Sequence, residues 1–310
     1  MDEGYVLVIG SAGIDVKGRP KSELEWEAAN LGRVSNNVGG VARNIAENLA
    51  RLEVETVLLT AVGKDSAGRR VIRKCEMAGI DCQYIRVIPH VRTGTYMALL
   101  TPSGDLMTAI SDFSVMESVD SDYLHEHEHL FEDAAMVVMD ATLSIPALAT
   151  LFELADRHQV RVCVDPTTPA LAANLCDYID RIYMVSPNAA ETTALCGLKD
   201  AAHDHETATN AARHLVSLGA KVAVVTLGER GLAYADGSGG GYLSAISTRV
   251  VDPTGAGDAF SGAVIFGLLN EVSLDEAMRL GVTAASLTLQ SQHTVVPNLT
   301  QEMLYAQLAI

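Results

Sequence analysis

The chain has 310 residues, of which 48% are hydrophobic and 20% are charged, enough for one large folded domain or two small ones and too apolar for a disordered protein. Acidic residues number 39 against 22 Lys and Arg, which gives a formal net charge of −17. A chain this acidic has no general attraction for nucleic acid or anionic lipid, so an anionic ligand needs a local device such as a helix N-terminus.

Six short apolar runs, rich in β-branched residues and almost free of charge, predict buried strands. They are Tyr5–Ile9, Thr56–Ala61, Met136–Met139, Val160–Val164, Ile182–Val185 and Val222–Leu227. Amphipathic helices are predicted between them, for example over Ala42–Leu52 and Thr207–Leu218. Apolar strands that alternate with helices indicate a doubly wound α/β fold, with a mainly parallel sheet flanked by helices.

Two segments interrupt this alternation. Residues 16–38 are polar and irregular, and we expect no helix there. Residues 92–112 predict a hairpin whose strands, Gly94–Leu100 and Leu106–Ile110, are joined by a turn containing proline and glycine. Two non-helical insertions in an α/β sheet indicate a small β-sheet layer. We therefore expect a single domain over residues 1–310, with these two insertions forming a lid.

The five cysteines are odd in number and form no C-x-x-C pair, which predicts reduced thiols in a cytoplasmic protein. They are Cys75, Cys82, Cys163, Cys176 and Cys196. The longest apolar stretches are interrupted by Asp140, Pro146 or Asp258. No membrane-spanning segment is therefore expected.

The segment that precedes the last long apolar helix carries the richest pattern. A strand end runs into a small-residue turn and then into a helix reaching about Leu269; the turn consists of Gly255, Ala256 and Gly257. Their backbone N–H groups, with the helix dipole, would form an anion hole. Asp258 follows in the first turn, where a carboxylate can accept a proton from a hydroxyl group. The alternative is a simple capping aspartate, but two glycines, Thr254 and two aspartates within seven residues favour the functional interpretation.

Paired glycines, Gly39 and Gly40, precede a second helix whose first turn carries Arg43 and Asn44. Glycines permit a ligand to approach closely, and the Asn44 amide offers a sugar hydroxyl both a donor and an acceptor. An ordinary junction between a loop and a helix is the alternative.

Three further positions lie where doubly wound folds bind ligands. Asn188 and Glu191, at i and i+3 after a strand, are oxygen ligands suited to Mg²⁺, although the same pair is also a common helix cap. Asp15 follows the first strand and Asp140 ends another, so each is either a ligand contact or a capping residue.

Other candidate motifs are incomplete. Gly10–Gly13 does not meet the G-x-G-x-x-G pattern of dinucleotide-binding proteins, and no Walker A sequence occurs. Gly237–Gly241 is not followed by a helix and is expected at the tip of a loose hairpin. His125 and His129 have the i, i+4 spacing of metal ligands, but their acidic neighbours favour a solvated helix face.

Taken together, three motifs resemble those of the ribokinase-like (PfkB) carbohydrate kinase family. They are Gly39-Gly40-x-x-x-Asn44, Asn188-x-x-Glu191 and Asp252-x-Thr254-Gly255-Ala256-Gly257-Asp258. Their order and spacing fit the family across essentially the whole chain. The resemblance implies a doubly wound core with a β lid, and ATP-dependent phosphorylation of a hydroxymethyl group on a sugar or nucleoside.

The resemblance also implies roles by motif position. Asp258 would deprotonate the acceptor hydroxyl, the turn at 255–257 would hold the transferring phosphoryl group, and Asn188 and Glu191 would organise Mg²⁺ through water. The nucleotide site would comprise Asn188, Thr226, Gly228, Gly231, Gly255 and Gly257. The acceptor would contact Asp15, Gly39, Gly40, Asn44, Ser111, Asp112 and Asp140.

Many relatives bind a monovalent cation such as K⁺ near the equivalents of Asp252 and Thr254. The stretch Gln290–Val296 departs from the ribokinase pattern at this point. The resemblance therefore does not decide whether this chain has a K⁺ site.

Within the family, the segments 5–16, 41–50 and 109–112 are most similar to those of bacterial pseudouridine kinases. Ser111 and Asp112 would then lie over the acceptor and hydrogen-bond a base edge. Other sugar or nucleoside kinases, of the ribokinase, fructokinase or purine nucleoside kinase type, are the alternatives. A non-catalytic binding module would not need Asp258, and an oxidoreductase would need the missing glycine fingerprint. Relatives often pair through their lids, so a homodimer is a further expectation.

Overall fold

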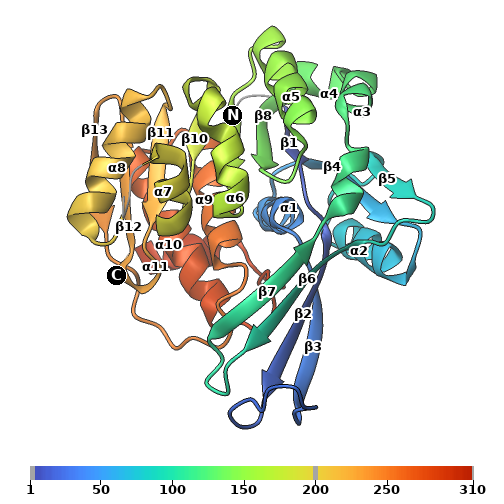
Figure 1. The fold of residues 1–310 in the computed structure, drawn as a ribbon. Helices are drawn as coiled ribbons and strands as arrows, with labels where there is room; N and C mark the ends of the chain where they lie inside the picture. Colours follow the sequence, from blue (N-terminus) through green and yellow to red (C-terminus); the bar gives the residue numbers. More distant parts are fainter. Residues whose placement is uncertain (1–3, 198–201, 309–310) are drawn as a thin grey trace.

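The structure is a computed structural model that describes residues 4–197 and 202–308, and in these residues a nine-stranded sheet forms the centre of the molecule (Figure 1). Its strand order is β13-β12-β11-β10-β9-β8-β1-β4-β5; β12 is antiparallel to both of its neighbours, and all other neighbouring pairs are parallel. The bounds are β1 Tyr5–Ile9, β4 Thr56–Gly63, β5 Ile85–Ile88, β8 Ala134–Asp140, β9 Val162–Asp165, β10 Met184–Val185, β11 Val222–Thr226, β12 Leu232–Asp236 and β13 Gly239–Leu243. All six strands predicted from apolar runs are confirmed.

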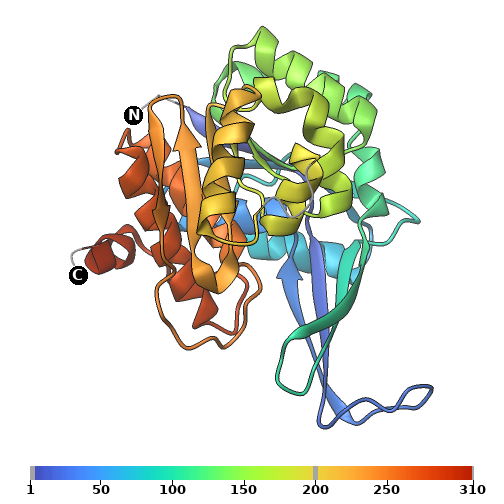
Figure 2. The same cartoon turned by 60° about the vertical axis from the view of Figure 1, so that its left-hand side comes forward.

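Helices cover both faces of this sheet (Figure 2). One face packs against α1 (Val41–Arg51), α2 (Ser66–Met77), α9 (Ala256–Leu269), α10 (Leu274–Leu289) and α11 (Gln301–Leu308). The other packs against α3 (Ser121–Glu126), α4 (His129–Glu132), α5 (Ile145–Arg157), α6 (Pro169–Ala172), α7 (Ala189–Cys196) and α8 (His205–Ser217), with the 3₁₀ helices η1 (Ser114–Ser118) and η2 (Ala173–Arg181). In β1, Leu7 and Ile9 belong to the second layer while Val6 and Val8 belong to the first, so the strand is buried on both sides.

The strand order reverses beside β1. The chain passes from β1 to β4 and β5 on one side, and then returns to the other side of β1 as β8. In open parallel sheets, ligands bind outside the carboxyl ends of the strands at such a point. Gly10 follows β1 there and Asp140 ends β8.

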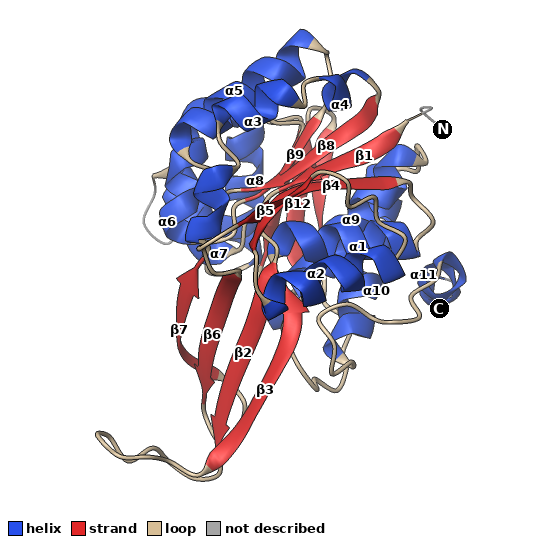
Figure 3. Ribbon diagram, turned by 90° about the vertical axis from the view of Figure 1, so that its right-hand side faces the viewer, coloured by secondary structure: helices blue, strands red, loops and turns tan. Residues whose placement is uncertain are grey.

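A second, four-stranded sheet projects from the main sheet, as Figure 3 shows. Its order is β3-β2-β6-β7, with bounds β2 Gly13–Pro20, β3 Gly32–Gly39, β6 Gly94–Leu100 and β7 Leu106–Asp112. We call it the lid sheet. The predicted hairpin of 92–112 and the small β-sheet layer are confirmed, but 16–38 is less irregular than expected, because β2 and β3 occupy its two ends. Eight residues of β2 pair with β3 and six of them also pair with β6, and this pairing overrides the polar composition of the segment.

The glycine-rich hairpin differs in detail from the expectation. Gly239–Gly241 belong to β13, and the tip is reduced to Gly237 and Ser238. The Asp236 carboxylate accepts hydrogen bonds from the N–H groups of Ser238 and Gly239, at 2.8 and 2.9 Å, and closes this short turn. A β-carbon on Gly240 would lie 2.3 Å from the Tyr234 carbonyl oxygen, so glycine lets the strands approach.

Within the described ranges, 4–197 and 202–308, no helix is both long and apolar enough to cross a membrane. All five cysteines are free. The same ranges contain no group of three or more His, Cys, Asp or Glu side chains placed to hold a metal ion. The ring of His127, which lies between His125 and His129 in the sequence, packs against the rings of Tyr84 and Tyr123.

Candidate active site

The N-terminus of α9 lies at the centre of the site. Gly255 is its N-cap, with a φ of 85° and no side chain capping the helix. A β-carbon on Gly255 would lie 2.0 Å from the Thr294 carbonyl oxygen, so only glycine fits. A β-carbon on Gly257 would meet no atom within 4 Å, so the space beside this turn is open. Uncapped N–H groups facing open space at a helix N-terminus suit a phosphoryl group.

Asp258 lies one residue beyond this turn, and its side chain is close to fully buried at 9% exposure. Its Oδ2 accepts a hydrogen bond of 2.6 Å from Nδ2 of Asn44, on α1. Burial raises the pKa of Asp258 to about 7, and the nearby charges of Asp15 and Asp140 act in the same direction. Asn44 and Arg43 lower it. A carboxylate with a pKa near neutrality is well matched to accept a proton from a hydroxyl group.

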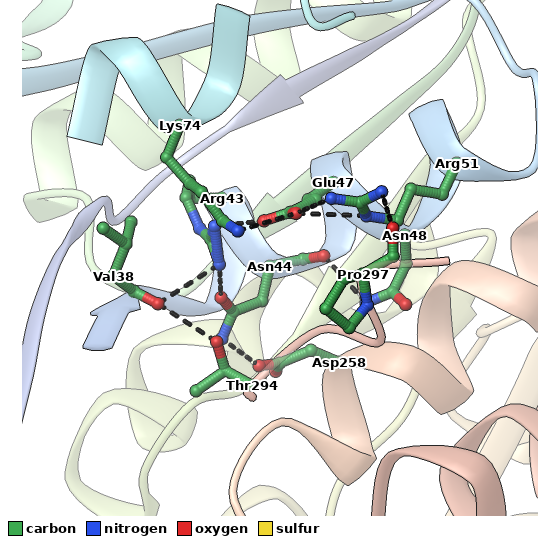
Figure 4. A network of polar contacts seen from close by, with 10 residues as sticks. All are labelled: Val38, Arg43, Asn44, Glu47, Asn48, Arg51, Lys74, Asp258, Thr294 and Pro297. Carbon is green, nitrogen blue, oxygen red and sulfur yellow. Dashed lines mark hydrogen bonds and ion pairs between the residues drawn. The ribbon is translucent and has the colours of Figure 1, made fainter. Parts of the chain in front are cut away.

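A buried arginine orients Asn44, as Figure 4 shows. Arg43 is 1% exposed and donates hydrogen bonds to Oδ1 of Asn44 and to Glu47, and at 3.3 Å to the Val38 carbonyl oxygen. Because Oδ1 of Asn44 faces a donor, its amide NH₂ must face Asp258. Arg43 is not among the site residues that the sequence predicts. Its i, i+4 spacing from Glu47 was the available signal.

Asp15 enters the site from β2 of the lid sheet and is 5% exposed. Burial raises its pKa to about 6, while Lys17 and Arg43 lower it. A β-carbon on Gly39 would lie 2.3 Å from the Asp15 carboxylate oxygens, so Gly39 is required for this approach. Gly40 has a φ of 96° and turns the chain from β3 into α1. The structure thus brings Asp15, both glycines, Asn44 and Asp258 together.

Asp140 does not have the expected substrate-binding geometry. It is fully buried, and its Oδ2 accepts hydrogen bonds from the N–H groups of Ser11, at 2.8 Å, and Ala42, at 3.1 Å. Its Oδ1 accepts hydrogen bonds from the N–H, at 3.1 Å, and the hydroxyl of Thr142. Asp140 therefore joins the ends of β1 and β8 to the start of α1, which is a structural role.

The residues expected at the nucleotide end lie at neighbouring strand ends. Asn188 caps α7 in a reciprocal capping box with Glu191, whose carboxylate accepts hydrogen bonds of 2.9 Å from the Asn188 N–H and 2.7 Å from its side-chain amide. Thr226, at the end of β11, pairs with Asn188. Burial raises the pKa of Glu191, and it raises that of Asp165 well above the ordinary value, with the charges of Asp258 and Glu191 adding to the rise. Asp165, which sequence reasoning missed, therefore belongs to the same acidic site.

Gly228 and Gly231 flank the 3₁₀ turn η3 (Gly228–Arg230) that follows β11. Both have positive φ angles, 60° and 94°. A β-carbon on Gly231 would lie 2.0 Å from the Leu243 carbonyl oxygen. The two glycines therefore let the chain reverse direction after β11, so that β12 begins beside Thr226.

The two side chains expected to ligate a monovalent cation instead hold a lysine. Nζ of Lys17, on β2, donates to Oδ1 and Oδ2 of Asp252 at 2.8 and 2.6 Å and to Oγ1 of Thr254 at 2.6 Å. Although burial raises the pKa of Asp252, the hydrogen bonds from Lys17 and from the Thr254 N–H hold it below its ordinary value. Lys17 was not predicted as a site residue.

Strand register decides which lid residues lie on the same face of the lid sheet as Asp15. Asp15 pairs with Asn37 on β3 and with Tyr96 on β6, and Tyr96 pairs with Ser111 on β7. Paired residues share one face of a sheet, so these four side chains form a row on the Asp15 face, which we call the lid row. The charge of Asp15 adds to the burial that raises the pKa of Tyr96. Tyr96 and Asn37 were missed because their strand pairing is not readable from the sequence.

Asp112 lies on the opposite face of the lid sheet from Ser111, because successive residues of a strand alternate. Its Oδ1 accepts a hydrogen bond of 3.1 Å from the Ser114 N–H, and its side chain is exposed. Asp112 therefore does not lie where the sequence predicted a contact with a base, whereas Ser111 lies on the same face of the lid sheet as Asp15.

Comparison with known proteins gives one consistent result. The profile of the pfkB family carbohydrate kinases matches residues 3–301. Pseudouridine kinase of Escherichia coli (strain K12) is 31% identical over 300 residues, which covers 96% of this chain and 95% of that protein. Guanosine-inosine kinase of Exiguobacterium acetylicum is 28% identical over 303 residues, covering 95% of this chain and 97% of that protein. The structure of Arabidopsis thaliana ribokinase complexed with ribose and ATP shares the fold, with a TM-score of 0.82, 22% identity and 99% of each chain covered.

The fold and these likenesses define a ribokinase-like phosphotransferase that acts on an alcohol group. The chain belongs to the PfkB family of carbohydrate kinases. Kinases of this family use ATP and Mg²⁺.

If Asp258 is the base, Asp258→Asn should lower kcat by on the order of 10²–10⁴ while ATP still binds. The measurement is steady-state turnover beside ATP affinity by calorimetry.

A folding control comes from the linkage between protonation of Asp258 and stability. Burial raises the pKa of Asp258 in the folded state to about 7, so the folded state favours the protonated carboxyl group. The stability that this preference gives is present at low pH and is lost as the pH rises through about 7. Asp258→Asn should therefore raise Tm at about pH 8 more than at about pH 5. Near-normal turnover would refute the assignment.

The pH dependence of the reaction should follow the two buried carboxylates. Asp258 must be deprotonated to accept a proton, so kcat/KM for the acceptor should fall as the pH drops below about 7. Asp15, with a pKa of about 6, should steepen the fall at lower pH if it accepts a hydrogen bond from the acceptor. The profile is measured at saturating ATP and Mg²⁺. A flat profile between about pH 5 and pH 8 would contradict both roles.

Proposed function

We propose that the protein transfers the γ-phosphoryl group of ATP to the 5′-hydroxymethyl group of a ribosyl compound, and that this compound is pseudouridine. The observation that carries the proposal is the juxtaposition of Asp258 and its Asn44 partner with Asp15 and the lid row. This arrangement supports the proposal, because a candidate base and a candidate anion hole would then lie beside groups able to hydrogen-bond a sugar and a base edge. The similarity to Escherichia coli pseudouridine kinase supports the choice of acceptor.

In the proposed reaction, Asp258 accepts the proton of the acceptor hydroxyl as its oxygen attacks the γ-phosphorus of ATP, and ADP leaves. The N–H groups at 255–257 stabilise the charge on the transferring phosphoryl group. Asp15 accepts hydrogen bonds from the ribose hydroxyls, and the Asn44 amide donates hydrogen bonds to them.

Mg²⁺, when bound, neutralises charge on the ATP phosphates. The oxygens of Asn188 and Glu191 suit this hard cation. Each already accepts hydrogen bonds within the capping box, so we propose that they hold it through water.

The lid row supplies a basis for recognising the base. Pseudouridine is a C-glycoside, so its ring keeps an N–H that is absent from uridine. The hydroxyl oxygens of Tyr96 and Ser111 and the amide oxygen of Asn37 can accept a hydrogen bond from that N–H. A site built around such an acceptor discriminates strongly, because uridine leaves it buried and unpaired.

Another nucleoside kinase activity is the second candidate. The guanosine-inosine kinase of Exiguobacterium acetylicum is nearly as similar over the same span. A purine also presents N–H and carbonyl groups to the lid row. The five free thiols support a cytoplasmic location for either activity.

We expect kcat/KM to be higher for pseudouridine than for uridine, guanosine, inosine and free ribose, measured side by side at saturating ATP and Mg²⁺. Tyr96→Phe and Ser111→Ala should reduce the preference for pseudouridine over uridine more than they reduce kcat. Asp112→Ala, on the opposite face, is the matched control and should leave the preference unchanged. If guanosine or ribose is the best acceptor, the pseudouridine proposal fails while the kinase assignment stands.

We also propose that two copies pair through the lid. Val16 pairs with Met97, which pairs with Ile110, so these apolar side chains share the face opposite the lid row. Met97 and Ile110 are 50% and 64% exposed. A second copy would bury this face and protect the sheet from other contacts.

Light scattering should therefore show a dimer, and Ile110→Glu should convert it to a monomer. Leu218→Glu, at an exposed position beyond the end of α8, is the matched control and should leave the dimer intact. A monomer at all concentrations would refute this arrangement without bearing on the reaction.

A further inference from the structure

Lys17 is 6% exposed although it is a lysine on a projecting sheet. Its ammonium group has three protons, and the three oxygens that accept them are Oδ1 and Oδ2 of Asp252 and Oγ1 of Thr254. The ion pair is buried on the lysine side and only 23% exposed on the aspartate side. The charge of Lys17 is therefore held at one fixed point.

That point lies beside the anion hole. Oδ1 of Asp252 also accepts a hydrogen bond of 2.9 Å from the Thr254 N–H, which shapes the turn leading to Gly255. Unneutralised, the Asp252 carboxylate would oppose a phosphoryl group at the α9 N-terminus. The Lys17 ammonium offsets this negative charge and fixes the turn.

A monovalent cation does not fit between these side chains while Lys17 is there. The family resemblance implies such an ion near Asp252 and Thr254, but the oxygens of both already contact an ammonium, which is similar in size and charge to K⁺. A second cation at the same oxygens would lie within a few ångströms of Nζ and be repelled.

We propose that Lys17 is a tethered replacement for the monovalent cation, so that phosphoryl transfer by this protein does not require K⁺. Lys17 is a positioning residue: it acts through Asp252 and the turn at 254–255, and it does not touch the reacting atoms. The charge comes from the lid sheet, so it reaches the anion hole together with Asp15. The proposal rests on the kinase activity of the family and is independent of which acceptor is used.

The test compares the wild type with Lys17→Met, which keeps an unbranched side chain but lacks the terminal ammonium group. Rates are measured at constant ionic strength while choline is replaced by K⁺. The wild-type rate should change less than about twofold. Lys17→Met should lose on the order of 10–100-fold in choline, as for other residues that orient a charged centre, and K⁺ should restore part of the loss. Lys21→Met, an exposed lid lysine, is the matched control and should behave as the wild type.

A second measurement needs no acceptor, so it separates this proposal from the pseudouridine assignment. K⁺ should raise the Tm of Lys17→Met, because it binds the vacated oxygens in the folded state, and should leave the wild-type Tm unchanged. If Lys17→Met does not fold, Lys17→Arg takes its place and should remain independent of K⁺.

Three outcomes would overturn the proposal. They are strong activation of the wild type by K⁺, full activity of Lys17→Met in choline, and a loss in Lys17→Met that K⁺ relieves neither in rate nor in Tm. The last result would make Lys17 an anchor for the lid and nothing more.

Discussion

The burial of negative charge at the N-terminus of α9, where we propose that a phosphoryl group binds, is the constraint on which the candidate active site depends. Asp258, Asp15 and Asp252 converge near the N-terminus of α9 in a protein that is already strongly acidic. Each carboxylate loses hydration, and each raises the cost of charging its neighbours. Two buried cations, Arg43 on α1 and Lys17 on β2, offset that cost. Arg43 orients the neutral amide of Asn44, and its charge also lowers the pKa of Asp258, whereas Lys17 pairs directly with Asp252 and keeps it ionised.

The main sheet delivers these groups to one place because helices from distant parts of the chain pack closely. A β-carbon on Gly262 would lie 2.9 Å from the Asn48 β-carbon, so glycine lets α9 lie directly against α1. Gly262 is one turn beyond Asp258, and Asn48 is one turn beyond Asn44. The close approach at one level therefore sets the 2.6 Å contact at the next. Asp140 holds the start of α1 against the ends of β1 and β8, so its burial serves the site without contact to substrate.

Features encoded locally could be predicted from the sequence. The buried strands are continuous apolar runs, and the turn at 255–257 combines glycines with a following apolar helix, so both carry their signal within a few residues. Asp140 and Asp112 were misassigned because a strand-end aspartate has the same local sequence whether it faces a ligand or the backbone. Lys17 and Tyr96 depend on pairing between strands about eighty residues apart, and register of that kind is fixed by tertiary packing.

The sequence nevertheless contains one pattern that predicts a strand of the lid sheet. Ile14 and Val16 alternate with Asp15 and Lys17, which is the period of a strand with one apolar and one polar face. The polar face carries both the Asp15 carboxylate, which lies against Gly39, and the Lys17 ammonium, which contacts Asp252 and Thr254. Because these two groups lie two residues apart on one strand, a movement or substitution of β2 displaces both together. In the proposed mechanism, acceptor recognition and the charge balance of phosphoryl transfer are therefore coupled through the lid, while the main sheet and α9 carry the candidate base and the candidate anion hole.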